Sequence, residues 1–346
     1  MLGPVLRESC LLQLFPLPQK VEYRLIRLVL KRLGAVIPVL FIVSIMLFVL
    51  ISMLPGDAAQ SILAEGSTAE DLQKLRDDMG LTQPLYQQYF TWIRKLLSGD
   101  LGKSLLTGQT VAEKLQQRLP VTLELSILAM ILSVLIALPL GVISAVKRNT
   151  AIDVAASAFS VVGVAMPAFW LGMLLIIVFC INLGWLPASG YVPFWENPLE
   201  NLRRMVLPSV TVALAFTATI TRQTRAAMLE VLSADYILTA RAKGLKKRIV
   251  LWKHALKNAL IPVVTVVTMQ TGRLVGGAVV TETVFALPGI GREIVDAIQA
   301  RDYPVAMALI MLVVLAVIVM NLIADILYLF IDPRIRTQKG GRKVSA

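Results

Sequence analysis

Six mostly apolar stretches alternate with polar segments along the chain. Each is close to the roughly 20 residues that a helix needs to cross the hydrocarbon core of a bilayer. A proline at position 167 interrupts the third stretch and predicts a tilt or kink there. The pattern predicts an all-α, polytopic membrane protein with six transmembrane helices. The predicted spans are residues 34–54, 121–146, 155–183, 205–221, 259–284 and 304–331.

The composition agrees with a lipid environment. Hydrophobic residues make up 57% of the 346 positions and charged residues 16%, whereas soluble domains are about 45–50% apolar. The net charge of +12 is carried largely by basic residues at the ends of apolar stretches, which is typical of cytoplasmic loops in membrane proteins. The charge therefore indicates contact with membrane lipid and not binding to nucleic acid.

The distribution of Lys and Arg predicts the orientation of the spans. With the N-terminus inside, the inside segments contain 22 of these residues and the short outside segments contain 4. The long outside segment, residues 55–120, contains 7 more, but loops of that length do not determine orientation. We therefore expect both termini to be cytoplasmic.

This orientation divides the chain into five predicted regions. They are an unassigned N-terminal extension (1–24), a basic juxtamembrane segment with the first helix (25–54), a small extracytoplasmic subdomain (55–120), a core transmembrane domain with a cytoplasmic loop at 222–258 (121–336), and a basic cytoplasmic tail (337–346).

The sequence lacks the residues that several kinds of catalytic site require. Its one histidine, His254, excludes any metal site built on two histidines. The stretch "GDLGKS" (99–104) resembles a phosphate-binding loop, but Leu97 stands where the first glycine of that motif is needed. We therefore expect no enzyme activity, no cofactor and no metal in this chain, and any ATP would be bound by another subunit.

Three stretches carry a resemblance to a known family. The first is the cytoplasmic loop, which contains "ADYILTARAKGLKKR" (234–248). The second begins "MGLTQPLYQQYF" at position 79 and continues into the second span, and the third is "TETVFALPGIGREIVDAIQARDYPV" (281–305). In this order they resemble the permeases of the dipeptide/oligopeptide/nickel family of ATP-binding cassette importers. Leu238 departs from the family, which commonly has Arg there.

The resemblance implies the type I importer permease fold in a bacterial inner membrane. It also implies several partners: a second homologous permease, two ATPase subunits that bind ATP and Mg, and an extracytoplasmic substrate-binding protein. In such importers the permease alternates between outward-facing and inward-facing states as the ATPases close and open. The expected substrate is a di- or oligopeptide.

Two alternative functions remain open from the sequence. Nickel chelates, glutathione and oligosaccharides are alternative substrates within the same family, because selectivity depends largely on the binding protein. A secondary transporter or channel that works alone is an alternative from a different class. Such transporters often contain inverted repeats, and we find none in this sequence.

The cytoplasmic loop is the first candidate site. In the family this loop forms a short coupling helix that docks on the ATPase, and its glycine, here Gly244, allows a turn between two helices. The alternative is a solvated basic loop near anionic lipid, which attracts each basic residue by about 1 kcal/mol. The expected coupling residues are Asp235, Tyr236, Thr239, Ala240, Arg241, Ala242, Lys243 and Gly244.

Polar residues inside the spans form the second candidate site, because such residues are costly in a membrane and commonly functional. Gln270 and Arg273 are three residues apart and share a helix face, which we expect to line the translocation path or a subunit interface. The alternative is structural pairing, such as Arg273 with Glu124. The candidates are Glu124, Gln270, Arg273 and Asp325.

The stretch "LPGIGRE" (287–293) is the third candidate site. It predicts a turn into a short outer helix, which either contacts the binding protein or caps the pore. The candidate contact residues are Gly289, Gly291 and Arg292.

Overall fold

The computed structural model of the chain describes residues 19–54, 59, 68–78 and 80–331. These residues form a bundle of long helices. Five helices of this part are long and apolar enough to cross a membrane, and a bent pair adds a sixth when it is counted as one span. The long helices are α1 (Gln19–Ser52), α5 (Val111–Val146), α8 (Pro198–Leu232), α11 (Leu256–Gly277) and α14 (Tyr303–Ile331).

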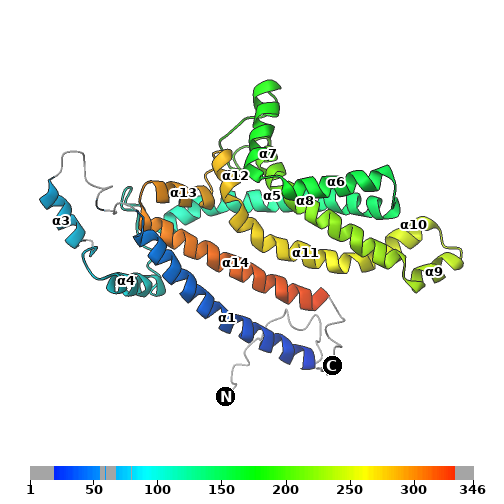
Figure 1. Ribbon diagram of the computed structural model, residues 1–346, viewed down its shortest axis with the longest axis horizontal. Helices are drawn as coiled ribbons and strands as arrows, with labels where there is room; N and C mark the ends of the chain where they lie inside the picture. The colour runs from blue at the N-terminus through cyan, green and yellow to red at the C-terminus, as the bar shows by residue number, and fades with distance from the viewer. Residues whose placement is uncertain (1–18, 55–58, 60–67, 79, 332–346) are drawn as a thin grey trace, which may run out of the picture.

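The third predicted span is broken and not merely kinked. Helix α6 (Ala151–Ala165) ends at Met166, and α7 (Ala168–Leu175) follows at an angle of 106° and continues into the π-helical turn η1 (Ile176–Asn182). Pro167 explains the break, because proline has no N–H and excludes the helical conformation from the residue before it; Met166 has ψ 123°. As a result α7 projects away from the bundle (Figure 1).

Helices α5 and α8 form the centre of the bundle and approach each other closely. A Cβ atom on Gly141 of α5 would lie 2.6 Å from the Cβ of Thr224 and 2.8 Å from the carbonyl oxygen of Thr221, both on α8. A Cβ atom on Gly163 of α6 would likewise lie 2.9 Å from the Cβ of Ala218 on α8. Small residues permit this spacing, as they commonly do between membrane helices.

The fifth predicted span, 259–284, is too long. The helix α11 ends at Gly277. A separate short helix, α12 (Val279–Val284), follows, and α13 (Ile290–Gln299) connects it to α14. The residues after 277 therefore belong to an outer layer of short helices.

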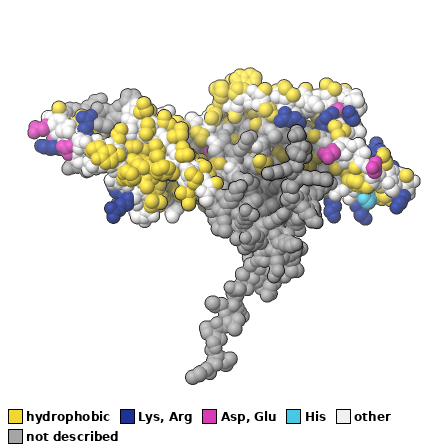
Figure 2. All heavy atoms as spheres, turned by 60° about the horizontal axis from the view of Figure 1, so that its bottom comes forward, with side chains coloured by type: hydrophobic (Ala, Val, Ile, Leu, Met, Phe, Trp, Pro, Cys, Tyr) yellow, Lys and Arg dark blue, Asp and Glu magenta, His cyan; other side chains and the backbone are white. Residues whose placement is uncertain are grey.

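The two ends of the bundle differ in what they carry (Figure 1). One end carries α3 (Ala69–Asp78), α4 (Leu85–Leu97), α12 and α13; α4 packs Tyr89 and Trp92 against Phe48 of α1. The opposite end carries α9 (Asp235–Ala242), α10 (Lys247–Ile249) and the π-helical turn η2 (Val250–Ala255). The start of α1 and the end of α14 lie toward this second end. Apolar side chains cover much of the described surface between the ends (Figure 2).

Candidate functional site

Helix α9 contains most of the predicted coupling residues and protrudes from the end of the bundle (Figure 1). Only Ile237 and Ala240 of its eight residues are buried. The other six are exposed, as are Lys243 and Gly244, and Leu238 is 53% exposed. The helix is thus fixed to the protein along one face and presents the rest to its surroundings.

The buried face of α9 belongs to a hydrophobic cluster that joins four other elements. Ile237 and Ala240 belong to the same cluster as Val142 of α5, Met228 of α8 and Val263 of α11, and the main neighbour of α9 within it is η2. Tyr236 adds a polar contact, since the side-chain amide of Asn258 donates a hydrogen bond of 2.8 Å to its hydroxyl oxygen. A displacement of α9 would therefore act on the ends of α5, α8 and α11 together.

Gly244 forms the turn after α9 in a left-handed conformation, with φ +77°. Its N–H donates to the carbonyl of Arg241 at 2.9 Å, and the N–H of Leu245 donates to the carbonyl of Ala240. An added Cβ would meet nothing within 4 Å. The glycine is therefore required by its backbone conformation and not by close packing.

The surface around α9 combines basic and apolar side chains. Arg241, Lys243 and Lys247 are exposed there, and so is Trp252, at 60%. Figure 2 shows basic side chains gathered at this end of the molecule. Such a mixture of aromatic, aliphatic and basic groups is typical of a protein-binding surface.

A polar cluster ties together the helices behind α9, and we did not predict it. Asp153 in the first turn of α6 is 4% exposed and receives two hydrogen bonds from Arg225 of α8, at 2.6 and 2.8 Å. Ser144 of α5 donates a third at 2.5 Å, and the backbone N–H of Asn149 a fourth. One carboxylate therefore connects α5, α6 and α8, and its partner Arg225 lies ten residues before α9 begins.

The predicted outer-loop residues surround a buried carboxylate, that of Glu282 on α12. Thr122 of α5 donates its hydroxyl hydrogen to Glu282 Oε1 at 2.7 Å, and the backbone N–H of Arg292 donates to Oε2 at 3.0 Å. A Cβ on Gly289 or Gly291 would lie within 3.0 Å of the Glu282 carboxyl group. Both glycines are buried, so they provide room for this carboxyl group.

Burial dominates the electrostatics of Glu282. It raises the pKa of this carboxyl above its ordinary value, while the hydrogen bonds from Thr122 and from backbone N–H groups partly oppose the shift. The side chain of Arg292 points elsewhere and lies 3.5 Å from Asp296. Glu282 could have been identified as a candidate from the sequence, because it is an acidic residue within a predicted span.

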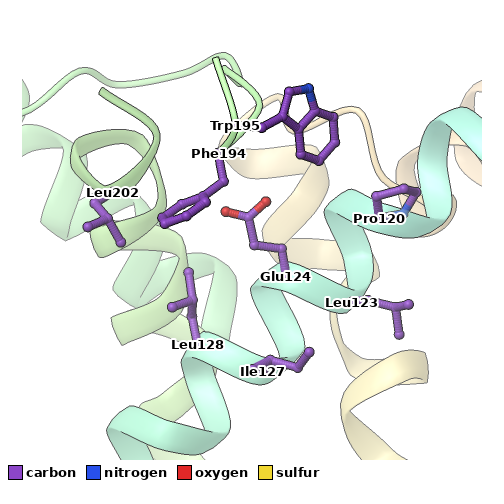
Figure 3. A pocket seen from close by; sticks show the side chains of 8 residues that line it. All are labelled: Pro120, Leu123, Glu124, Ile127, Leu128, Phe194, Trp195 and Leu202. Atoms are coloured by element: carbon purple, nitrogen blue, oxygen red, sulfur yellow. The ribbon is translucent and has the colours of Figure 1, made fainter. Parts of the chain in front are cut away.

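The structure describes the side chains of two of the four predicted polar residues of the spans, Glu124 and Gln270. Glu124 of α5 accepts a hydrogen bond of 2.7 Å from Tyr191, and its carboxylate lies in a pocket lined by the residues labelled in Figure 3. Gln270 of α11 is 8% exposed and lies within the bundle. The side chains of Arg273 and Asp325 lie outside the described part of the structure. Among the residues that are described, no three His, Cys, Asp or Glu side chains are grouped as metal ligands would be.

Comparison with known proteins identifies the family to which this chain is similar. Residues 137–337 match the family model of the binding-protein-dependent transport system inner membrane component, and residues 25–126 match that of the N-terminal part of such membrane components.

Three relatives are similar over 89% of this chain and 98% of their own length. A putative peptide transport system permease protein of Brucella abortus is 42% identical, and the glutathione transport system permease protein GsiC of Escherichia coli K12 is 44% identical. The dipeptide transport system permease protein DppB of Alkalihalophilus pseudofirmus is 41% identical.

The fold is also similar to that of a solved structure, the MetNI methionine ABC transporter in an inward-facing conformation. The TM-score is 0.51 at 19% identity, over 63% of this chain and 96% of that chain. The family models together cover most of the chain, and the relatives match it over nearly their whole length. This chain belongs to the family of inner-membrane components of binding-protein-dependent transport systems.

Proposed function

We propose that this chain is a translocation subunit of an ATP-driven importer for di- or oligopeptides, and that α9 is its docking helix for an ATPase subunit. The observation that carries the proposal is the placement of α9. Its two buried side chains pack on η2 and belong to a hydrophobic cluster that also contains residues of α5, α8 and α11, while its remaining residues are exposed at one end of the bundle.

The chain belongs to a family of membrane transport components and not to an enzyme family. In the proposed importer, the energy for uptake therefore comes from a partner. A docked ATPase that closes on ATP would move α9, and the cluster around Ile237 and Ala240 would transfer this movement to three spans. The proposed complex contains a second homologous permease, two ATPases and an extracytoplasmic binding protein. Both termini and α9 would lie in the cytoplasm, in agreement with the distribution of Lys and Arg.

Peptides are the proposed substrate because two of the relatives named above are peptide or dipeptide permeases. Glutathione is the second candidate, because a glutathione permease is 44% identical to this chain. Uptake of a labelled dipeptide by cells that express the full complex, in competition with unlabelled glutathione, separates the two. Competition by a second dipeptide and not by glutathione is the result that we expect.

The docking proposal is tested with Gly244→Arg. The variant is strained, since an L-residue is forced into positive φ, and it places a long side chain beside α9. We expect the variant chain to insert into the membrane. The ATPase subunits should no longer be recovered with it on purification, and transport-coupled ATP hydrolysis should be lost. Gly99→Arg is the matched control, because Gly99 also has positive φ (+85°) and open space, but lies at the outer end. Wild-type uptake in Gly244→Arg, or equal loss of the ATPase in both variants, would contradict the proposal.

A further inference from the structure

A pocket of about 390 Å³ lies between the outer ends of α5 and α8 and the loop that precedes α8. Its walls are apolar except for one carboxylate, that of Glu124 (Figure 3). Pro120 and Ile127 of α5 and Leu202 of α8 contribute to the walls, and Phe194 and Trp195 of the loop lie beside the carboxylate. A single charged group in an apolar cavity is the kind of polar feature that orients a ligand.

The two oxygens of Glu124 have different surroundings. Oε2 accepts the hydrogen bond from Tyr191, whereas Oε1 is buried and has no hydrogen-bond partner among the residues that the structure describes. Tyr191 remains a donor, because burial and the neighbouring carboxylate raise the pKa of its phenol. Oε1 is therefore an unpaired acceptor, and a buried acceptor without a partner is costly.

The basic side chains near this pocket have acidic partners elsewhere. Arg118, on the same helix as Glu124, lies 3.0 Å from Glu293. Arg203 and Arg204, on α8 beside Leu202, both pair with Glu200. The charge of Glu124 thus has no counterpart among these described cations, and an external cation would supply one.

The geometry favours one kind of cation. A guanidinium group binds a carboxylate best through both oxygens, and here it would have to share Oε2 with Tyr191. A metal ion needs several oxygen ligands, and this pocket offers one carboxylate. A primary ammonium group needs a single acceptor and is attracted to aromatic faces, which Phe194 and the 73% exposed Trp195 supply.

We propose that the Glu124 pocket binds a primary ammonium group. Two sources carry this group to the outer end of a membrane protein: the amino terminus of a peptide and the ethanolamine headgroup of a phospholipid. The peptide source rests on the proposed function, whereas the lipid source does not. Glu124→Gln is the central variant, because glutamine keeps an oxygen for Tyr191 and removes the charge.

The peptide test uses the chain purified with its ATPase and permease partners, without the binding protein, in phosphatidylcholine nanodiscs. Tryptophan emission is recorded while Ala-Ala or N-acetyl-Ala-Ala is added. The lipid test measures, by native mass spectrometry, the retention of phosphatidylethanolamine against phosphatidylcholine at equal amounts. A charged hydrogen bond predicts that the wild type prefers the ammonium form by about tenfold or more in at least one test.

Glu124→Gln should abolish this preference, and Trp195→Ala should weaken it severalfold. Glu196→Gln is the matched control, since Glu196 is an exposed acid next to Trp195, and it should retain the preference. A preference in the peptide test alone identifies a substrate site, and one in the lipid test alone identifies a lipid site.

The proposal is overturned by a wild type without preference in either test. It is also overturned if Glu124→Gln retains the preference or if Glu196→Gln loses it equally. Elution volume and melting temperature verify that each variant is folded, and Trp195→Ala provides the test if Glu124→Gln is not. Failure here leaves ATPase recovery with Gly244→Arg unaffected, so the two proposals fail separately.

Discussion

Helix α5 places a hydroxyl group against each of two buried carboxylates, but the two carboxylates are stabilised differently. Ser144, near the α9 end, donates to Asp153, which also receives two hydrogen bonds from the cation Arg225. Thr122, in the half of α5 farther from α9, donates to Glu282, whose other donors are backbone N–H groups. The first cluster depends on one cation from another span, and the second on neutral groups.

The difference indicates different tasks for the two ends. The Asp153 cluster joins three helices close to α9, where a charged partner tolerates small movements better than exact backbone contacts do. In the other cluster, the Thr122 oxygen also accepts from the N–H of Ile290, so Thr122 and Glu282 fix the turn between α12 and α13. We therefore expect the Asp153 cluster to transmit movement and the Glu282 cluster to hold a fixed shape.

Arg225→Ala should have the largest effect, because it leaves the Asp153 carboxylate without its cation. Breaking a buried pair typically costs 3–5 kcal/mol, and we expect about 3 kcal/mol because Arg225 is partly exposed. The measurement is the free energy of unfolding in mixed detergent micelles. The double variant Asp153→Asn/Arg225→Ala should recover part of the loss. A single variant as stable as the wild type would show that the cluster does not hold these helices together.

Gly141→Ala tests the same end through packing and should cost about 1–3 kcal/mol. The added methyl group would collide with Thr224 and with a backbone carbonyl, neither of which moves easily. Gly276→Ala is the control, since its Cβ would meet nothing within 4 Å; a helical alanine there should be neutral or stabilising by up to about 1 kcal/mol. Equal melting temperatures for the two variants would contradict the close α5–α8 approach.

Much of this architecture could be predicted from the sequence. The family, the helical fold and the inner-membrane location are confirmed, because a bilayer of fixed thickness selects apolar segments of fixed length. Pro167 indicated an interruption, but the sequence did not predict that α6 and α7 would meet at 106°. The end of α11 was missed because the residues after it remain apolar although they form an outer helix.

The candidate sites were less predictable, because their contacts join distant positions. Helix α9 was recognised from a local motif, and its docking role stays a prediction. Tyr191 lies 67 positions from Glu124, and no local spacing relates the two. Asp153 and Arg225 were missed since each stands near the end of an apolar stretch, where charged residues are ordinary.

Glu282→Gln should have a smaller effect than Arg225→Ala, because neutral donors and not a cation surround the carboxyl group. We expect a loss of about 1–2 kcal/mol at pH 4, since the glutamine amide brings hydrogens to a site of donors. Burial raises the pKa of Glu282 above about 4.5, so the folded state binds its proton more tightly than the unfolded state.

Protonation of Glu282 contributes its full stabilisation to the folded state below pH 4.5. This contribution is lost as the pH rises through the raised pKa of the folded protein. The difference between wild type and Glu282→Gln should therefore shrink from pH 4 to pH 7. Unfolding measured across this range checks the sign. A difference that grows with pH would mean that Glu282 is stabilised as an ion, as Asp153 is by Arg225.

Arg118→Ala should have the smallest effect on stability. It tests whether the loss expected for Arg225→Ala comes from leaving a buried carboxylate without a cation. Like Arg225, Arg118 approaches a buried carboxylate, with Nε 3.0 Å from Glu293 Oε2, although without the geometry of a hydrogen bond. Glu293 has a second cation, since Lys114 Nζ lies 2.5 Å from its Oε1. Removal of Arg118 therefore leaves the charge paired, and we expect a loss of about 1 kcal/mol or less in the same micelle assay. A loss equal to that of Arg225→Ala would mean that the cost comes from the removed arginine and not from an unpaired carboxylate.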